Sequence, residues 1–196
     1  DAYAGAFSAM VLSCNEISRQ QKKQYEVILD RTLFFPEEGG QTADTGTLSD
    51  IAVEDVQIHA GVIIHLLSEP LPAGQQVQGR INWEHRFSNM QQHSGEHIFS
   101  GIVHASYGYD NVGFHLSDSV VTMDYNGVLS GEQISKIEQE VNRVISLNLE
   151  IQISYPSAQE LMTLQYRSKK EIDGQVRIVT VPGYDICACC APHVKR

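Results

Sequence analysis

Short segments rich in apolar and β-branched residues, with polar residues between and around them, occupy the first part of the chain, from residue 8 to about residue 83. The segments are SAMVLSC, YEVILD, DTGTL, VEDVQIH, GVIIHLL and QQVQGRINW. Turn residues in GG, TGT, HAG and PAG separate them. Short strand-like segments broken at short intervals by turn residues predict a small β-barrel or sandwich.

A polar loop, PEEGGQTADTG at residues 36–46, interrupts these strands and contains three glycines. The adjacent Gly39 and Gly40 permit backbone angles that other residues avoid. From the residues alone, we expect a tight turn here.

The pattern changes after Trp83 to helical spacing, weakly over 88–107 and clearly over 130–149. Ser130 and Gln133 form the sequence of a capping box at the start of the second helix. Between and after these helices, VTMDY, EIQISY and VRIVTV are strand-like, and Ser157 with Glu160 predicts another capped helix. The apolar positions of the two long helices are Met90, Ile98, Phe99, Ile102 and Val103, then Ile134, Ile137, Val141, Val144 and Ile145.

This change of period predicts an α+β protein with a boundary near residue 84. Residues 1–84 would form a β-barrel domain that carries the glycine-rich loop, and residues 85–196 an α/β domain with an antiparallel sheet. The chain has 196 residues, of which 42% are hydrophobic and 19% charged, which is ordinary for a globular protein with a proper core.

Charge and targeting signals narrow the classes of function. A net charge of −10 and a pI near 5.2 argue against a protein that coats nucleic acid through its overall field, and we expect no DNA partner. No apolar run approaches the roughly 20 residues of a membrane span, and the start DAYAGAFSAM does not resemble a signal peptide. We therefore expect a cytoplasmic protein without a membrane partner. The absence of an initiator Met suggests a processed chain or missing first residues.

Two segments carry metal-binding residue types. QQHSGEHIFS, residues 91–100, places His93 and His97 four apart, so both imidazoles lie on one face of a helix. CACCAPHV, residues 187–194, offers Cys189 and His193, with Cys187 and Cys190 as rival ligands. Three histidines and one cysteine form a set that zinc takes in tetrahedral geometry. We expect the remaining histidines, His104 included, to be surface or core residues.

Three classes of function are compatible with these residues. His93, Glu96 and His97 match H-x-x-E-H, the inverted zinc-peptidase signature in which the glutamate is the base, but that class leaves C-x₃-H unexplained. A structural zinc site in a binding module is the second class, and it accounts for four protein ligands.

If the zinc is instead catalytic, four protein ligands need explaining. Such a site needs a labile ligand, an expanded coordination, or zinc that only orients the substrate.

The third class comes from a resemblance carried by four ordered motifs. They are DRTLFFPEEGGQTADTG (30–46), GRINWEHRFSNMQQHSGEHIFSG (79–101), VGFHLSDSVVTMDY (112–125) and CACCAPHV (187–194). In order and spacing this set resembles the editing domain of alanyl-tRNA synthetases and of the free-standing AlaX trans-editing proteins. The resemblance covers nearly the whole chain.

The resemblance implies a β-barrel domain joined to an α/β editing domain with one zinc ion, and hydrolysis of alanine tRNA mischarged with serine or glycine. It implies that His93, His97, Cys189 and His193 hold the zinc. It also implies that Gln41, in the loop with Gly39 and Gly40, lines the editing pocket. Thr32 would recognise the serine hydroxyl.

Other assignments stay open at the level of sequence. Glu96 is a candidate base or a solvated group beside the ligands. Basic residues could hold the phosphates of the tRNA acceptor end. We expect Arg80, Arg86, Lys169 and Lys170 among them. The filling of C-x₃-H departs from the family's usual CGGTH. The family normally continues beyond His193, so we expect either a truncated C-terminus or a fold that closes differently.

Overall fold

A computed structural model describes residues 1–19, 21–117, 119–168 and 174–196. Lys169 and Lys170 lie outside the described residues. The chain divides into two compact units, Asp1–Asn89 and Met90–Arg196. Each unit is described by itself below.

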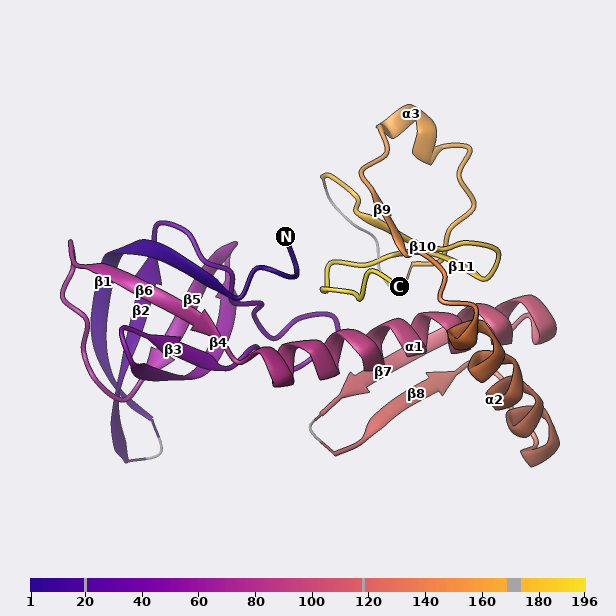
Figure 1. Ribbon diagram of the computed structural model, residues 1–196, viewed down its shortest axis with the longest axis horizontal. Helices are drawn as coiled ribbons and strands as arrows, with labels where there is room; N and C mark the ends of the chain where they lie inside the picture. The colour runs from indigo at the N-terminus through magenta and orange to yellow at the C-terminus, as the bar shows by residue number, and fades with distance from the viewer. Residues whose placement is uncertain (20, 118, 169–173) are drawn as a thin grey trace. The chain divides into compact units, whose positions relative to one another are not determined.

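The first unit is a closed barrel of six strands in the order β1-β2-β5-β4-β3-β6 (Figure 1). All neighbouring strands are antiparallel. The strands are β1 (Ala6–Arg19), β2 (Lys22–Leu29), β3 (Gly46–Leu48), β4 (Ile51–His59), β5 (Val62–Leu67) and β6 (Gln76–Ile81).

Alternation along the strands builds the core of the barrel. In β6, Val77, Gly79 and Ile81 face inward while the residues between them are exposed. Gly79 is required there, because an added Cβ would lie 2.2 Å from the ring of Phe7. The long strand β1 pairs with β6 over its first half and with β2 over its second, and a register shift between Val11 and Ser13 marks the turn from one partner to the other.

The glycine-rich loop contains the tight turn that its sequence predicts. Gly39 and Gly40 both have positive φ, 64° and 83°, which only glycine adopts without strain. Glu38 and Gln41 exchange two backbone hydrogen bonds across them, of 3.3 and 3.1 Å. The turn thereby fixes the backbone of Gln41, whose side chain is fully buried.

Helix α1 (Trp83–Tyr107) begins five residues before the expected 88 and runs through the proposed boundary at residue 84 without a break. Asn82 explains its start, since the Asn82 side chain accepts a hydrogen bond from the backbone N–H of His85. Trp83 and Phe87, four positions apart in this first part of the helix, pack on each other and on Tyr3.

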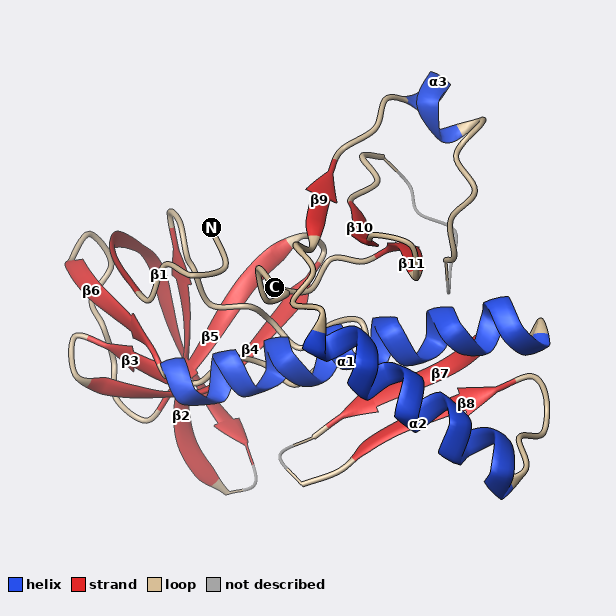
Figure 2. Ribbon diagram, turned by 45° about the vertical axis from the view of Figure 1, so that its right-hand side comes forward, coloured by secondary structure: helices blue, strands red, loops and turns tan. Residues whose placement is uncertain are grey.

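The second unit continues α1 with a two-stranded sheet, a second long helix and a three-stranded sheet in the order β11-β10-β9 (Figure 2). Its core joins Ile98 and Ile102 of α1 to Ile137 and Val144 of α2, with Val181 of β10. The elements are β7 (Asn111–Leu116), β8 (Val121–Tyr125), α2 (Gly131–Ser146), β9 (Gln152–Ser154), α3 (Ala158–Leu161), β10 (Ile178–Val181) and β11 (Asp185–Ala188).

The predicted α+β class is confirmed, and both predicted capping boxes form, at Ser130 with Gln133 and at Ser157 with Glu160. Strands β7 and β11 were not predicted, because NVGFHL and DICA are short and lack clear alternation. Within the described ranges, the chain has no helix that combines the length and the apolar character needed to cross a membrane.

Candidate metal centre

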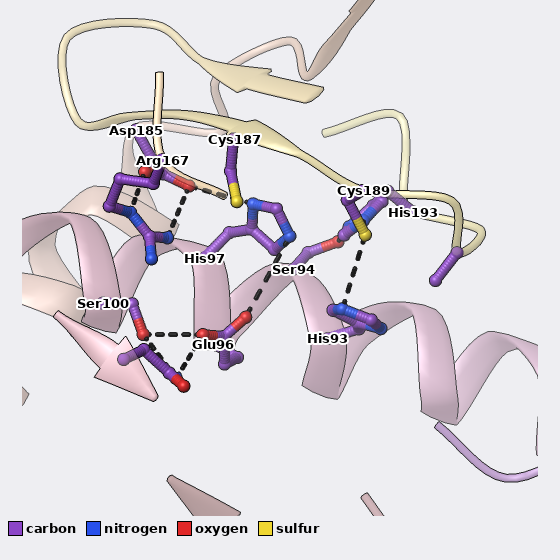
Figure 3. A network of polar contacts seen from close by, with 12 residues as sticks. His93, Ser94, Glu96, His97, Ser100, Arg167, Asp185, Cys187, Cys189 and His193 are labelled. Carbon is purple, nitrogen blue, oxygen red and sulfur yellow. Dashed lines mark hydrogen bonds and ion pairs between the residues drawn. The ribbon is translucent and has the colours of Figure 1, made fainter. Parts of the chain in front are cut away.

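Four side chains from two distant segments bring their ligand atoms together in the second unit. His93 and His97 lie one turn apart on α1, and Cys189 and His193 lie on the segment that follows β11. All four ligand atoms lie within 4.8 Å of one another. Figure 3 shows the histidines converging on the Cys189 sulfur. The helical repeat places His93 and His97 on one face of α1, and the segment after the sheet carries Cys189 and His193.

The spacing of these atoms fits a tetrahedral ion. Zinc binds thiolate sulfur at about 2.3 Å and imidazole nitrogen at about 2.0–2.1 Å, so tetrahedral ligands should lie about 3.6 Å apart from sulfur to nitrogen. The Cys189 Sγ lies 3.6 Å from His93 Nε2 and 3.3 Å from His193 Nε2. These two sulfur-to-nitrogen distances are close to those of a tetrahedral zinc centre.

Asp185 orients the ring of His97. The Nδ1–H of His97 donates to Asp185 Oδ2 at 2.9 Å, which leaves Nε2 to face the other three ligands. The guanidinium of Arg167 binds both oxygens of Asp185, through Nε at 2.7 Å and Nη2 at 3.0 Å. Gly101 of α1 permits the close approach of the segment that carries Asp185, since an added Cβ would lie 2.3 Å from the backbone oxygen of Tyr184.

Ser94 likewise orients the ring of His193. Its Oγ lies 3.0 Å from His193 Nδ1 and accepts the backbone N–H of Val194 at 3.3 Å. With Nδ1 bound to the hydroxyl, Nε2 of His193 faces the Cys189 sulfur. In a metal centre, the ring nitrogen of a histidine that does not face the metal usually has a hydrogen-bond partner. His97 and His193 each have such a partner, which is typical of a metal centre.

The protonation of these groups also favours a cation. Burial by itself would raise the pKa of Cys189, but hydrogen bonds from His193, His93 and His97 lower it well below its usual value. Burial lowers the pKa of His193 to about 3. Burial alone would lower the pKa of His97 as well, but the hydrogen bond to Asp185 raises it to about 9. A thiolate on Cys189 and a neutral imidazole on His193 are the forms that bind metal, whereas His97 has to release a proton when it binds one.

Glu96 is buried, at 3% exposure, and is not the solvated helix residue that the sequence allowed. Its Oε1 accepts hydrogen bonds from Ser100 Oγ at 2.6 Å and from Asn111 Nδ2 at 2.8 Å. Its Oε2 lies 4.0 Å from His97 Nε2, the nitrogen that faces the other ligands (Figure 3). A carboxylate oxygen is thus fixed beside the candidate centre.

Buried charge around the site also favours a cation. Hydrogen bonds from the histidines lower the pKa of Cys189, which favours its thiolate, and the guanidinium of Arg167 binds the carboxylate of Asp185. Uncompensated buried charge is costly, and a metal cation held by the four donors would compensate the thiolate.

The two rival cysteines, Cys187 and Cys190, are not part of the group of four ligands. Cys187 is buried and groups with His97 and Asp185, where Arg167 already neutralises the carboxylate. Burial raises the pKa of Cys187 to about 12, which keeps it a thiol. Cys190 is exposed and joins neither group of metal-ligating residues. His104 is exposed on α1 and pairs with Asp110, as a surface histidine would.

Comparison with known proteins shows what this chain is similar to. A family model described as tRNA synthetases class II (A) matches residues 7–85. The chain is 36% identical to the alanyl-tRNA editing protein Aarsd1 of Mus musculus over 210 residues, which cover all of this chain and 51% of the relative. It is 34% identical to the alanyl-tRNA editing protein AlaX-L of Pyrococcus horikoshii, over 90% of this chain and 46% of the relative.

The chain is thus similar to alanyl-tRNA editing proteins. It spans about half the length of the curated editing proteins it matches. It is also 32% identical, over its whole length, to 22% of an alanine–tRNA ligase from Ignicoccus hospitalis.

The residues expected to recognise substrate lie in the first unit. The hydroxyl of Thr32 lies 2.8 Å from His65 Nε2 and accepts the backbone N–H of Phe34 at 3.1 Å. His65 is fully buried, and its Nδ1 lies 3.0 Å from the carbonyl of Val27. Since a carbonyl only accepts, Nδ1 carries the proton, and Thr32 donates its hydroxyl hydrogen to Nε2.

Arg86, one of the expected phosphate contacts, is buried in the structure. Arg86 is 2% exposed and forms an ion pair with Asp44, which is fully buried. Its remaining donors bind the carbonyls of Ala2 and Leu33. Arg86 therefore stabilises the barrel and is not available to a phosphate. Arg80 is exposed on β6.

Sequence reasoning missed the residues that support the ligands, namely Asp185, Arg167 and Ser94. They lie up to 99 positions from the rings they hold, and no local pattern links them. The one available signal was that Ser94 falls next to His93. A cavity of about 920 Å³ is lined by Arg167 and Asp185 but by none of the four candidate ligands.

Proposed function

We propose that this chain is an aminoacyl-tRNA deacylase that hydrolyses, in trans, the ester of alanine tRNA mischarged with serine or glycine. Zinc is the metal, held by His93, His97, Cys189 and His193. The proposal rests on the family resemblance over the whole chain and, above all, on the convergence of those four donors within 4.8 Å.

The chemistry required is modest, because an aminoacyl ester is already activated. When bound, zinc would supply a concentrated positive charge beside the ester or its attacking water. Asp185 keeps the proton of His97 on Nδ1 and away from the reaction. Glu96 directs Oε2 to the same side of His97, where it can take a proton from water or bind the ammonium of the amino acid.

Thr32 is the proposed selector of the amino acid. Its hydroxyl donates to His65 and accepts from Phe34, so one lone pair remains to accept a hydrogen bond from a serine side chain. Alanine lacks that donor and would leave the partly buried oxygen of Thr32 with an unmet lone pair. Gln41, on the turn of Gly39 and Gly40, is the second proposed pocket residue. Arg80 remains the proposed phosphate contact.

The deciding experiment measures release of serine from serine-charged alanine tRNA, with correctly charged alanine tRNA alongside. We compare the parent chain with His97→Ala and with a matched control, His104→Ala, which removes an exposed histidine from the same helix. We expect hydrolysis of the mischarged tRNA alone, lost in His97→Ala and unchanged in His104→Ala. A zinc-loaded parent that releases no serine would refute the activity.

A structural zinc site is the second candidate, because four protein donors usually close a site to substrate. This candidate predicts that removing zinc with a chelator unfolds the second unit, followed by circular dichroism. The deacylase proposal predicts loss of serine release when zinc is removed and its return when zinc is restored. The H-x-x-E-H peptidase remains weaker, since Cys189 and His193 already complete the ligand set.

A further inference from the structure

The segment that carries two of the four candidate ligands, residues 189–193, has no regular secondary structure. Strand β11 ends at Ala188, whose ladder partner is Ile178 on β10. Beyond this pair the sheet no longer fixes the backbone. A loop left to itself would lose much conformational freedom on binding an ion, so something outside the ladder must hold it.

One residue, Arg177, binds this segment at three points. It directly precedes β10, and its backbone carbonyl accepts the N–H of Cys189 at 3.1 Å. Its guanidinium Nη1 donates to the carbonyl of Cys189 at 2.6 Å and to the carbonyl of Ala191 at 2.9 Å. Both backbone groups of the ligand Cys189 are therefore satisfied by the same residue.

The far end of the segment is held independently. Ser94 on α1 accepts the N–H of Val194 and contacts the ring of His193. Ala191, between the two anchors, is fully buried. The loop is thus fastened to β10 at Cys189 and Ala191, and to α1 at His193.

We propose that Arg177 is a positioning residue of the metal centre, which holds the Cys189–His193 loop in its ligand geometry before the ion binds. This role rests on the proposed zinc site. A guanidinium suits it, because the group stays charged and rigid, and its hydrogen bonds to carbonyls are charge-assisted. A clamp on the backbone also leaves the side chains of Cys189 and His193 free for the ion.

The test measures zinc affinity of the whole chain by competition with a chromophoric chelator. The variant Arg177→Met keeps the length of the side chain and removes the donors. We expect zinc affinity to fall about 10- to 100-fold, the usual effect of losing a group that supports a ligand. Arg177→Lys, which keeps a charge and a donor, should recover part of the loss. Cobalt(II) bound to Arg177→Met should show a weaker sulfur-to-cobalt absorption band, because Cys189 is less well placed.

The matched control is Arg143→Met, which removes an arginine from α2 that binds Glu140 and the hydroxyl of Tyr184. Its zinc affinity should equal that of the parent. Equal affinity in Arg177→Met and Arg143→Met would overturn the role of Arg177. The role would also be overturned if Arg177→Met lost no more free energy of zinc binding than free energy of folding of the zinc-free chain. That result would assign Arg177 to the fold alone. A parent that binds no zinc would refute the centre itself, a result that the chelator competition distinguishes at once.

Discussion

The Nδ1 of His97 lies 2.9 Å from Oδ2 of Asp185, although the two residues are 88 positions apart in the chain. Helix α1 and strand β11 meet at this hydrogen bond, and it sets which nitrogen of His97 faces Cys189 and the other ligands. An Asp–His pair that turns a ring toward three further donors is the usual arrangement behind a metal ligand.

The first prediction follows from this pair. Asp185→Asn removes the negative charge that holds the His97 proton on Nδ1 and that binds Arg167. We expect zinc affinity, measured by chelator competition, to fall about 10- to 100-fold. The control is Asp110→Asn. Asp110 binds Nδ1 of His104 at the same 2.9 Å, but both side chains are exposed, and His104 lies on the same helix as His97. Equal losses in both variants would contradict a special role for Asp185.

The second prediction concerns Glu96. Glu96→Gln keeps an oxygen that can accept from Ser100 and Asn111 but removes the charge beside His97. We expect zinc content to be unchanged and serine release to fall roughly 10²-fold, the scale of a lost proton-transfer group. Glu138→Gln, at an exposed site on α2, is the control. An unchanged rate in Glu96→Gln would remove Glu96 from the mechanism.

The third prediction concerns the ion pair of Arg86 with Asp44. Because both side chains are buried, Arg86→Met leaves an unpaired carboxylate in the barrel. We expect the free energy of unfolding to drop by about 3–5 kcal/mol, measured by denaturant titration. Arg80→Met removes an exposed arginine from the same barrel and should change it by less than about 0.5 kcal/mol. A similar small change in Arg86→Met would restore Arg86 as a candidate phosphate contact.

The fourth prediction is a pH dependence that arises from His65. Burial lowers the pKa of His65 from 6.5 to about 4. As the pH falls from 6.5 to about 4, the unfolded chain binds a proton that the folded chain does not, so stability decreases, and it levels off below pH 4. The contribution lost is about 3 kcal/mol, at 1.36 kcal/mol for each unit of pKa.

This effect is measured by denaturant unfolding of the parent and of His65→Gln between pH 7 and pH 4, with the His65 ring titrated by NMR. His65→Gln should lose less stability than the parent across this range. His59→Gln, at an exposed site on β4, should follow the parent. An NMR titration of His65 near pH 6.5 would contradict the prediction.

Local patterns in the sequence determined much of this protein. Short strand-like segments between turn residues predict the strands of the barrel, and helical spacing with Ser130 and Gln133 predicts α2. The spacing of four pairs His93 with His97 on one face of α1. These features depend on residues a few positions apart, whose geometry the backbone of a helix or strand already sets.

Only the tertiary structure decided which distant groups meet. It brings Cys189, rather than Cys187 or Cys190, to the three histidines, and it buries Arg86 with Asp44. It also supplies Asp185 to His97 and Arg177 to the ligand loop. The physical reason is that burial and hydrogen bonding across 12 to 99 positions follow from how helix and sheets pack, which the local alternation of residues does not encode.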